Sequence, residues 1–196
     1  SISDAFDPST FADIAPGMMS WQSRSNLVEL GADLKLKPEL AESFEGTDQA
    51  RKWVFKLRKG ATFHDGKTVT ADDVVTSFRH HMGPDSKSAA KTLLEPITDL
   101  KSDGPDTVVF TLKDGSADFP YLVSDYHIPI MPTKDGKSDW QSGVRTGPFV
   151  LEKFEPGVSA KFKRNPNYFK TDKPYLDEAE FIAITDVAAR TNALTT

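Results

Sequence analysis

The sequence contains one pairing of residue types that general acid-base chemistry uses, His64 followed directly by Asp65. An imidazole beside a carboxylate can hold a proton near neutral pH and pass it on. Adjacent residues of a turn point in different directions, however, and Asp65-Gly66 is typical of a turn. No Gly-x-Ser-x-Gly motif supplies a nucleophile that such a pair could activate. We therefore favour a turn that sets strand geometry over the alternative, a hydrolase that uses His64 and Asp65.

The other candidates for chemistry are also weak. His80 and His81 are neighbours, whereas two helical side chains share a face only when they are three or four residues apart. The chain has no His-Glu-x-x-His motif, no EF-hand pattern and no Gly-rich phosphate loop. Asp72 and Asp73 stand where a helix begins, so the helix dipole explains them better than a pair of glycosidase acids does. We expect no metal, no cofactor and no enzymatic activity.

A group of large apolar residues near the start favours binding instead. Met18, Met19 and Trp21 cover more than one face of a helix, so at least one of them should stay outside the core. Exposed apolar side chains of this size often line a ligand or partner surface. Ordinary packing remains the alternative for these residues.

The composition limits the class of protein. The 196 residues carry a formal net charge of −5 without a cluster of Lys and Arg, which argues against a nucleic-acid partner. There is no cysteine, so disulfides and thiolate metal sites are excluded. No apolar run approaches the roughly 18 residues that a membrane-spanning helix needs. No signal peptide is present, so we expect either a cytosolic protein or one whose signal peptide was removed.

The elements that position these residues alternate between short strands and helices. Apolar side chains recur at helical spacing from Val74 to Met82, behind Thr70 as a capping residue and Asp73 in the first turn. This pattern predicts a helix over 71–81. The other predicted helices are 16–26, 87–95 and a last one from Asp186 without a stop signal, and the predicted strands are 27–30, 34–36, 53–58, 107–112, 147–154, 158–163 and 180–184.

Residues 57–78, LRKGATFHDGKTVTADDVVTSF, resemble the signature of the extracellular solute-binding proteins of family 5, the peptide- and nickel-type substrate-binding proteins of ABC transporters. Further segments resemble the family in the expected order, and they are 26–30 (NLVEL), 38–44 (PELAESF), 146–149 (TGPF), 164–168 (RNPNY) and 174–181 (PYLDEAEF). The similarity therefore extends over nearly the whole chain.

The resemblance implies a mixed α/β fold, the type 2-like periplasmic binding protein fold, with an extra α+β subdomain in lobe I. Residues 1–30 and 135–196 would form the sheet domain of lobe I, and residues 31–134 the extra subdomain. Because members of this family are much longer, we expect an N-terminal portion with the second lobe missing and the ligand cleft half built. Such a portion should bind ligand weakly on its own.

By the same resemblance, the first helix and a later loop face the cleft. The candidate ligand-binding residues are Met18, Met19, Trp21, Asp125, Tyr126 and His127. Asp125 would receive a cationic amino group, and Trp21 and Tyr126 would cover apolar parts of the ligand. Ordinary packing and a solvated loop are the open alternative here, and His127 as a lone metal ligand is a further one.

The implied function is the substrate-binding component of an ABC importer, which captures a peptide or a similar small solute in the periplasm and delivers it to the permease. The implied partners are that solute and the permease subunits, without nucleic acid. The protein would be periplasmic or an extracytoplasmic lipoprotein. A sensor or interaction module on the same fold is the alternative, and the family signature leaves open whether the ligand is a dipeptide, an oligopeptide, a nickel complex or a sugar.

Overall fold

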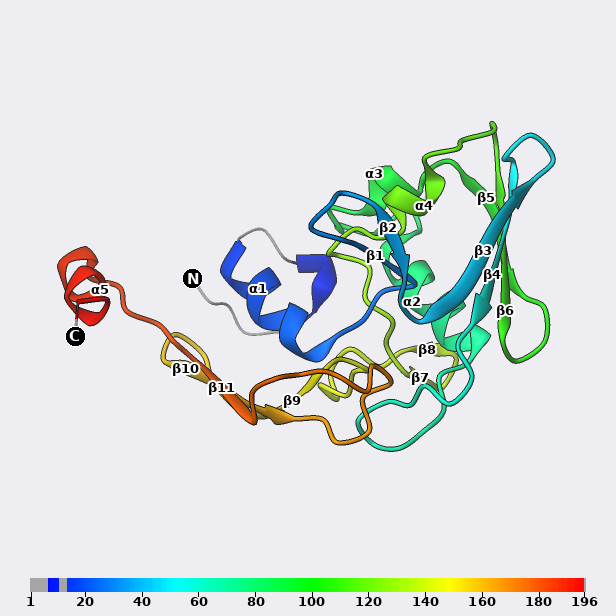
Figure 1. Ribbon diagram of the computed structural model, residues 1–196. Coiled ribbons are helices and arrows are strands. Elements are labelled where there is room, and N and C mark those ends of the chain that lie inside the picture. The colour runs from blue at the N-terminus through cyan, green and yellow to red at the C-terminus, as the bar shows by residue number, and fades with distance from the viewer. Residues whose placement is uncertain (1–6, 11–13, 196) are drawn as a thin grey trace.

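The computed structural model describes residues 7–10 and 14–195, with only the backbone of residues 14–16. Residues 1–6, 11–13 and 196 of the predicted lobe I segments lie outside the described residues. Within the described part, two antiparallel sheets form the main body, each packed against one helix, and short elements connect them (Figure 1). No helix in the described part of the chain has both the length and the apolar character that crossing a membrane requires.

The larger sheet has four strands in the order β3-β4-β6-β5, and each neighbouring pair is antiparallel. The two inner strands are β4 (Lys52–Leu57) and β6 (Thr107–Leu112), and the sequence predicts both. The outer strands β3 (Ala41–Thr47) and β5 (Ile97–Ser102) were not predicted. Both outer strands are rich in exposed polar residues, so they lack the apolar run that marks a strand in a sequence.

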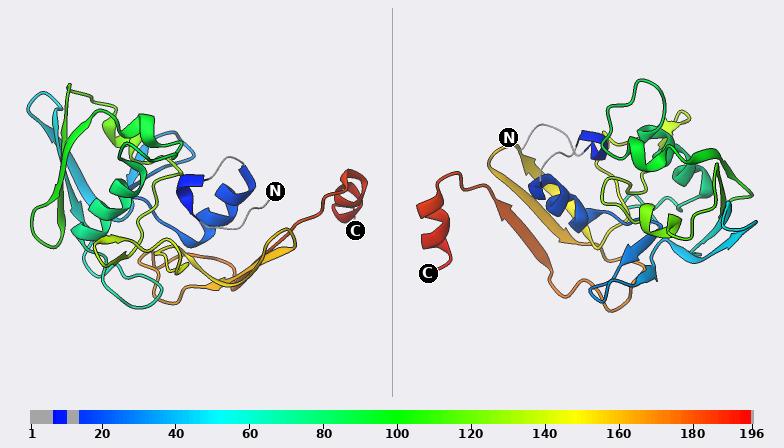
Figure 2. Two further views of the ribbon diagram at one scale, coloured as in Figure 1. Left: turned by 180° about the vertical axis from the view of Figure 1, so that it is seen from behind. Right: turned by 90° about the horizontal axis from the view of Figure 1, so that it is seen from above.

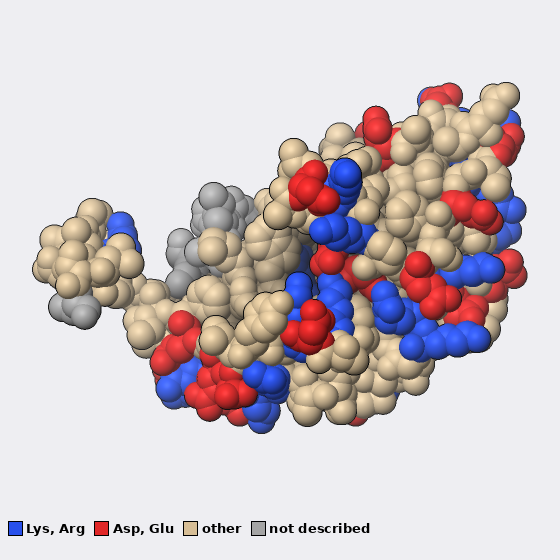
Figure 3. Space-filling model, in the orientation of Figure 1, with Lys and Arg blue, Asp and Glu red and all other residues tan. Residues whose placement is uncertain are grey.

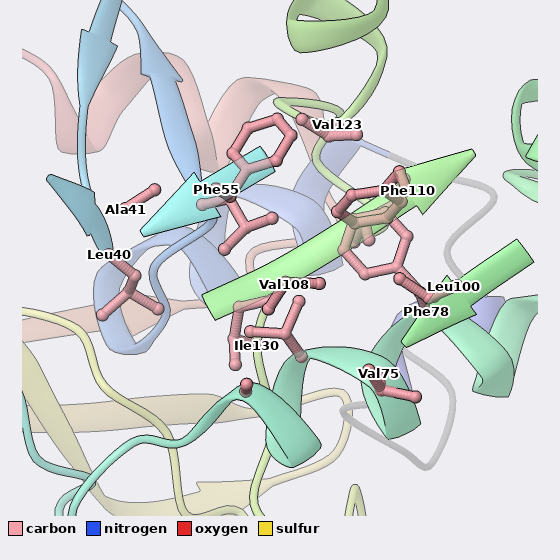
Figure 4. Packing of buried hydrophobic residues seen from close by; sticks show 14 of the residues in the cluster. Leu40, Ala41, Phe55, Val75, Phe78, Leu100, Val108, Phe110, Val123 and Ile130 are labelled. Atoms are coloured by element: carbon pink, nitrogen blue, oxygen red, sulfur yellow. The ribbon is translucent and has the colours of Figure 1, made fainter. Parts of the chain in front are cut away.

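The main hydrophobic core lies between this sheet and helix α2 (Ala71–His81), whose bounds are those predicted. Phe110 lies at its centre, and its ring is 5.0 Å from that of Phe78 on α2 and 5.4 Å from that of Phe55 on β4. Both ring pairs are edge-to-face, an arrangement that aromatic quadrupoles favour. Figure 4 shows these side chains pointing toward one another from the sheet and the helix.

The start of α2 is fixed by Asp73. Its carboxylate accepts hydrogen bonds from the backbone N–H and the hydroxyl of Thr70, at 2.8 and 2.7 Å, and from the N–H of Thr133 at 2.7 Å. Thr70 and Asp73 form the capping box that the sequence predicts, and the Thr70 hydroxyl also donates to the Asp73 carboxylate. The buried carboxylate therefore ties the helix to β7 (Thr133–Lys134) as well as capping it.

The smaller sheet has three antiparallel strands in the order β11-β10-β9, formed by β9 (Phe149–Glu155), β10 (Ser159–Arg164) and β11 (Glu178–Ile182). Helix α1 (Ile14–Ser23) packs on it, three residues shorter at its end than predicted. Met19 of α1 joins Phe149, Ala160 and Phe162 in a second hydrophobic cluster. This small cluster fixes α1, and with it the candidate residues on its outer side.

Helix α5 (Val187–Ala193) stands apart from both sheets (Figures 1 and 2). Asp186 caps it as the sequence predicts, since its carboxylate accepts from the N–H of Ala189 at 2.7 Å. None of its residues is buried. Local capping therefore accounts for this helix better than packing does.

The remaining elements are short. They are η1 (Pro8–Thr10), β1 (Val28–Leu30), β2 (Leu36–Pro38), α3 (Lys91–Leu94), α4 (Phe119–Leu122) and β8 (Lys137–Ser138). The predicted boundary between residues 30 and 31 falls inside the antiparallel pair of β1 and β2. The division at that point, and the one at residue 135, stay predictions.

Candidate functional site

Three of the six candidate residues meet beside helix α1. The ring of Trp21 lies 6.2 Å from that of Tyr126 in an edge-to-face arrangement, and Tyr126 lies 3.8 Å from the ring of His127. The loop that carries them is held in place by Asn26, whose side-chain amide donates to the carbonyls of Ser124 and Asp125 at 3.0 and 2.8 Å. The chain thus builds an aromatic surface from two segments about 100 residues apart.

The two methionines take different environments. Met18 is 47% exposed and Trp21 is 55% exposed, whereas Met19 is only 6% exposed and belongs to the second cluster. This agrees with the expectation that such a group leaves at least one side chain outside the core. Met18 and Met19 also line an apolar pocket of about 170 Å³ together with Phe154, Phe181 and Ile182.

Asp125 is already engaged within its own loop. One of its carboxylate oxygens accepts the backbone N–H of His127 at 2.9 Å and lies 2.7 Å from Nδ1 of the same residue. His127 is buried and Asp125 half-buried. The role of Asp125 as receiver of a cationic group stays a prediction, and a ligand would have to share the carboxylate with His127.

A polar cavity of about 370 Å³ opens on the other side of Trp21. Its polar lining includes Arg24, Asn26, Glu29, Glu39, Tyr168 and Lys170, which come from the segment after α1, from β1, and from the segments before β3 and after β10. The space-filling view shows basic and acidic side chains together around a hollow between the β1–β2 pair and the smaller sheet (Figure 3). Cavities of this volume are in the range of small-molecule sites.

Arg24 is the least solvated cation in this cavity. The residue is 3% exposed, and its three guanidinium nitrogens have no hydrogen-bond partner among the described residues. Its Cζ lies 5.4 Å from the centre of the Trp21 ring, within cation-π distance. Burial lowers the pKa of Arg24 to about 9, and the guanidinium therefore remains charged at neutral pH.

Glu39 faces the same cavity. Its carboxylate accepts the backbone N–H of Asn26 at 2.8 Å, and burial raises the pKa of Glu39 to about 7. Burial also raises the pKa of Tyr168. Lys170 pairs with Glu29 at 2.7 Å at the rim. The cavity thus combines a permanent buried cation with a carboxyl group that changes its charge near neutral pH.

The proposed acid-base pair is not assembled. Nε2 of His64 lies 3.1 Å from the carbonyl oxygen of Gly147, so that nitrogen must donate its proton there, and burial lowers the pKa of His64. Asp65 instead accepts the backbone N–H of Lys67 at 3.1 Å, as a turn residue does. His64 therefore links the turn to the segment before β9, a structural role.

The other two histidines also have separate partners. Nε2 of His80 lies 2.8 Å from the Asp7 carboxylate, and Nδ1 of His81 lies 2.7 Å from the Ser88 hydroxyl. Among the described residues, no group of three or more His, Cys, Asp or Glu side chains is arranged to hold a metal ion.

Sequence reasoning did not single out the polar cavity. Arg24 follows Gln22 and Ser23 in the polar last part of the predicted helix 16–26, and Glu39 lies in a segment that was interpreted only as a family motif. Their burial depends on contacts with residues 124–174, which a pattern along the chain does not report. The proximity of Arg24 to the candidate Trp21 is the one signal that was available.

Comparison with known proteins finds similarity over most of the chain. Residues 35–196 match the family model described as bacterial extracellular solute-binding proteins, family 5 Middle. The oligopeptide-binding protein AppA of Bacillus subtilis is 29% identical over 84% of this chain and 32% of its own length. Protein XP55 of Streptomyces lividans is 35% identical over 76% of this chain and 28% of its own length.

Solved structures give the same result. The structure of the PBP AgaA in complex with agropinic acid, from A. tumefaciens R10, is 28% identical and superposes with a TM-score of 0.90 over 99% of this chain and 40% of that one. The Bacillus subtilis AppA structure with a nonapeptide gives a TM-score of 0.86 at 27% identity, over 99% and 41%. The chain thus spans about a third of these curated relatives and about two fifths of these solved chains.

Proposed function

Since the chain belongs to the bacterial extracellular solute-binding proteins of family 5, we propose that the whole protein captures a small solute outside the cytoplasm and delivers it to an ABC importer. The mixed α/β fold predicted from the sequence, that of a periplasmic binding protein, is confirmed by the likeness to AgaA. Three of the relatives are named as binding proteins and not as enzymes, which supports a role without covalent chemistry.

The observation that carries this proposal is the aromatic surface of Trp21 and Tyr126, of which Trp21 also lines the polar cavity. A binding protein needs apolar area to hold a solute and a few fixed polar groups to orient it. The apolar area and the fixed polar groups are adjacent here, since Trp21 lines the polar cavity and also contacts Tyr126. The permease subunits are the partners that this role requires, and the protein would be periplasmic or an extracytoplasmic lipoprotein.

The names of the relatives support a proposal for the class of solute. One is named an oligopeptide-binding protein, one a di/tripeptide-binding protein and one a nickel-binding periplasmic protein. We propose a peptide or a similar small organic solute. The proposed ligand contacts are Met18, Met19, Trp21, Asp125, Tyr126 and His127. Because Met19 is buried, it would support the other contacts by packing beneath them.

The two-part organisation belongs to the same proposal. Residues 31–134, which hold the four-stranded sheet and α2, would form the extra subdomain, and residues 1–30 with 135–196 would form the sheet domain of lobe I. Two separate hydrophobic clusters support this division, although Leu27 and Val28 pack into the larger one.

Native mass spectrometry of the protein purified from its host tests the function, because a retained solute gives a defined mass increment. Trp21→Ala and Tyr126→Ala should each weaken the binding of that solute by at least about fivefold, since each removes aromatic contact area. Tyr121→Ala is the matched control, because Tyr121 is an exposed tyrosine that does not line the cavity. Retention of no solute, or equal losses in all three variants, would contradict the proposal.

A further inference from the structure

Arg24 carries a charge that the described structure does not balance. The guanidinium is removed from water, and none of its nitrogens has a hydrogen-bond partner among the described residues. An unpaired buried cation normally costs several kcal/mol, so proteins pair such groups or use them to bind anions. The free donors of Arg24 therefore call for an acceptor from outside the described chain.

The carboxylates that act most strongly on Arg24 have other hydrogen-bond partners. Glu39 and Asp125 are the two acids whose charges act most strongly on Arg24. Glu39 accepts the N–H of Asn26, and Asp125 accepts the N–H of His127 and lies against its ring. At the rim, Glu29 pairs with Lys170. None of these acids therefore forms a hydrogen bond with the guanidinium group of Arg24.

Trp21 covers one side of the Arg24 guanidinium. Its ring lies over the guanidinium, and each nitrogen of Arg24 is shielded from water. Trp21 itself is 55% exposed, and the ring contacts found for it are the edge of Tyr126 and Arg24. A side chain that is held so loosely can rotate on a short timescale, and its rotation would open the guanidinium to the cavity.

We propose that Arg24 binds the carboxylate group of the solute, with the apolar part of the solute against Trp21, which moves aside to admit it. This inference rests on the proposed function of solute capture and adds a chemical class to it. The planar guanidinium offers two parallel N–H donors that match the two oxygens of a carboxylate. Burial in the cavity strengthens such a pair by excluding water.

Phenylacetate is a suitable probe, because it joins a carboxylate to an aromatic ring, and phenylacetamide is its uncharged counterpart. Binding to the full 196-residue chain is followed by NMR through the side-chain Nε–Hε signal of Arg24 and the indole N–H signal of Trp21. We expect phenylacetate to shift both signals in a saturable manner and phenylacetamide to bind at least about tenfold more weakly. Equal affinity for the two compounds would overturn the assignment, as would tighter binding of inorganic phosphate than of phenylacetate.

Arg24→Gln should weaken phenylacetate binding by at least about tenfold. Lys173→Gln is the matched control, since it removes one positive charge from the exposed rim of the same cavity, and it should change the affinity by less than about threefold. Unchanged affinity in Arg24→Gln would refute the inference. Should Arg24→Gln lose its native circular dichroism spectrum, Arg24→Lys keeps the charge without the fork and should still weaken binding.

The two proposals fail in different ways. A solute that the native protein retains through Trp21 and Tyr126, with an affinity that Arg24→Gln leaves unchanged, would refute the Arg24 assignment and leave the proposed function standing. Saturable phenylacetate binding at Arg24, in a protein that retains no solute from its host, would count against the proposed function alone.

Discussion

His81 shows how strongly burial lowers the pKa of a histidine side chain. It is fully buried at the end of α2, and the Ser88 hydroxyl lies 2.7 Å from Nδ1 while the same hydroxyl oxygen accepts the N–H of Ala90. Nδ1 and the hydroxyl therefore share one hydrogen bond inside the core. Desolvation lowers the pKa of His81 to about 3, with a smaller contribution from His80.

This pKa predicts how the stability depends on pH. The folded-state pKa of His81 lies below its unfolded value of 6.5, so the unfolded chain binds more protons in the acid range, and the free energy of unfolding falls as the pH falls below 6.5. Between pH 7 and pH 4, His81 should account for a loss of about 3 kcal/mol. Urea titrations at several pH values measure the free energy of unfolding of the wild type and of His81→Asn. The part of the pH dependence that His81 causes should be absent from the variant.

Ser88→Ala serves as the control for His81. It removes the hydroxyl but keeps the ring buried, and burial is the main cause of the lowered pKa, so the pH dependence should persist. If the free energy of unfolding changed with pH equally in His81→Asn and in the wild type, the His81 ring would be solvated in solution.

At the level of single residues, the sequence predicted the exposed candidates better than the buried ones. Met18 and Trp21 lie outside the core, in agreement with the expectation that at least one of Met18, Met19 and Trp21 would do so. Arg24 and Glu39 were not predicted, because a charged residue in a polar stretch gives no signal of burial. Their surroundings are set by Tyr168 and Lys170, which are more than 125 residues away in the chain.

At the level of elements, α2 separates two neighbouring acids that look alike in the sequence. Asp72 is exposed and accepts the Ser102 hydroxyl at 2.8 Å, whereas Asp73 is buried and accepts three hydrogen bonds. The helix dipole favours both acids equally, so only the buried contacts distinguish them.

Asp73→Asn should therefore lower the free energy of unfolding by about 2–4 kcal/mol, because an amide cannot replace the charged acceptor of both Thr70 and Thr133. Asp72→Asn should cost less than about 1 kcal/mol, since its contacts are exposed. Thermal or urea unfolding of the two variants measures the difference. Equal losses would mean that the dipole alone accounts for both acids.

Strands and helices were predicted where burial leaves a periodic pattern. α2 and β6 have the predicted bounds, and β4, β9 and β10 agree within two residues. The edge strands β3 and β5 were missed because pairing with β4 and β6, and not an apolar face of their own, holds them in the sheet. Edge position is a property of the fold and not of the strand sequence.

At the level of the whole molecule, stability should be concentrated in the two sheets and absent from the C-terminal helix. α5 has seven residues, none of them buried, and isolated helices of that length are marginal in water. β11, in contrast, pairs with β10 and places Phe181 5.9 Å from the ring of Phe162 in the second cluster. The two segments are neighbours in the chain but differ in what they contribute.

Two truncations test this difference. Removal of residues 186–196 should change the free energy of unfolding by no more than about 0.5 kcal/mol, because it deletes only exposed contacts. Removal of residues 178–196 deletes β11 as well and should cost at least about 3 kcal/mol, since the buried face of β10 then loses Phe181. Urea unfolding compares the two forms with the full chain. A large loss on removing residues 186–196 alone would mean that α5 packs on the body in solution, and the face between β11 and α5 would then be part of the core.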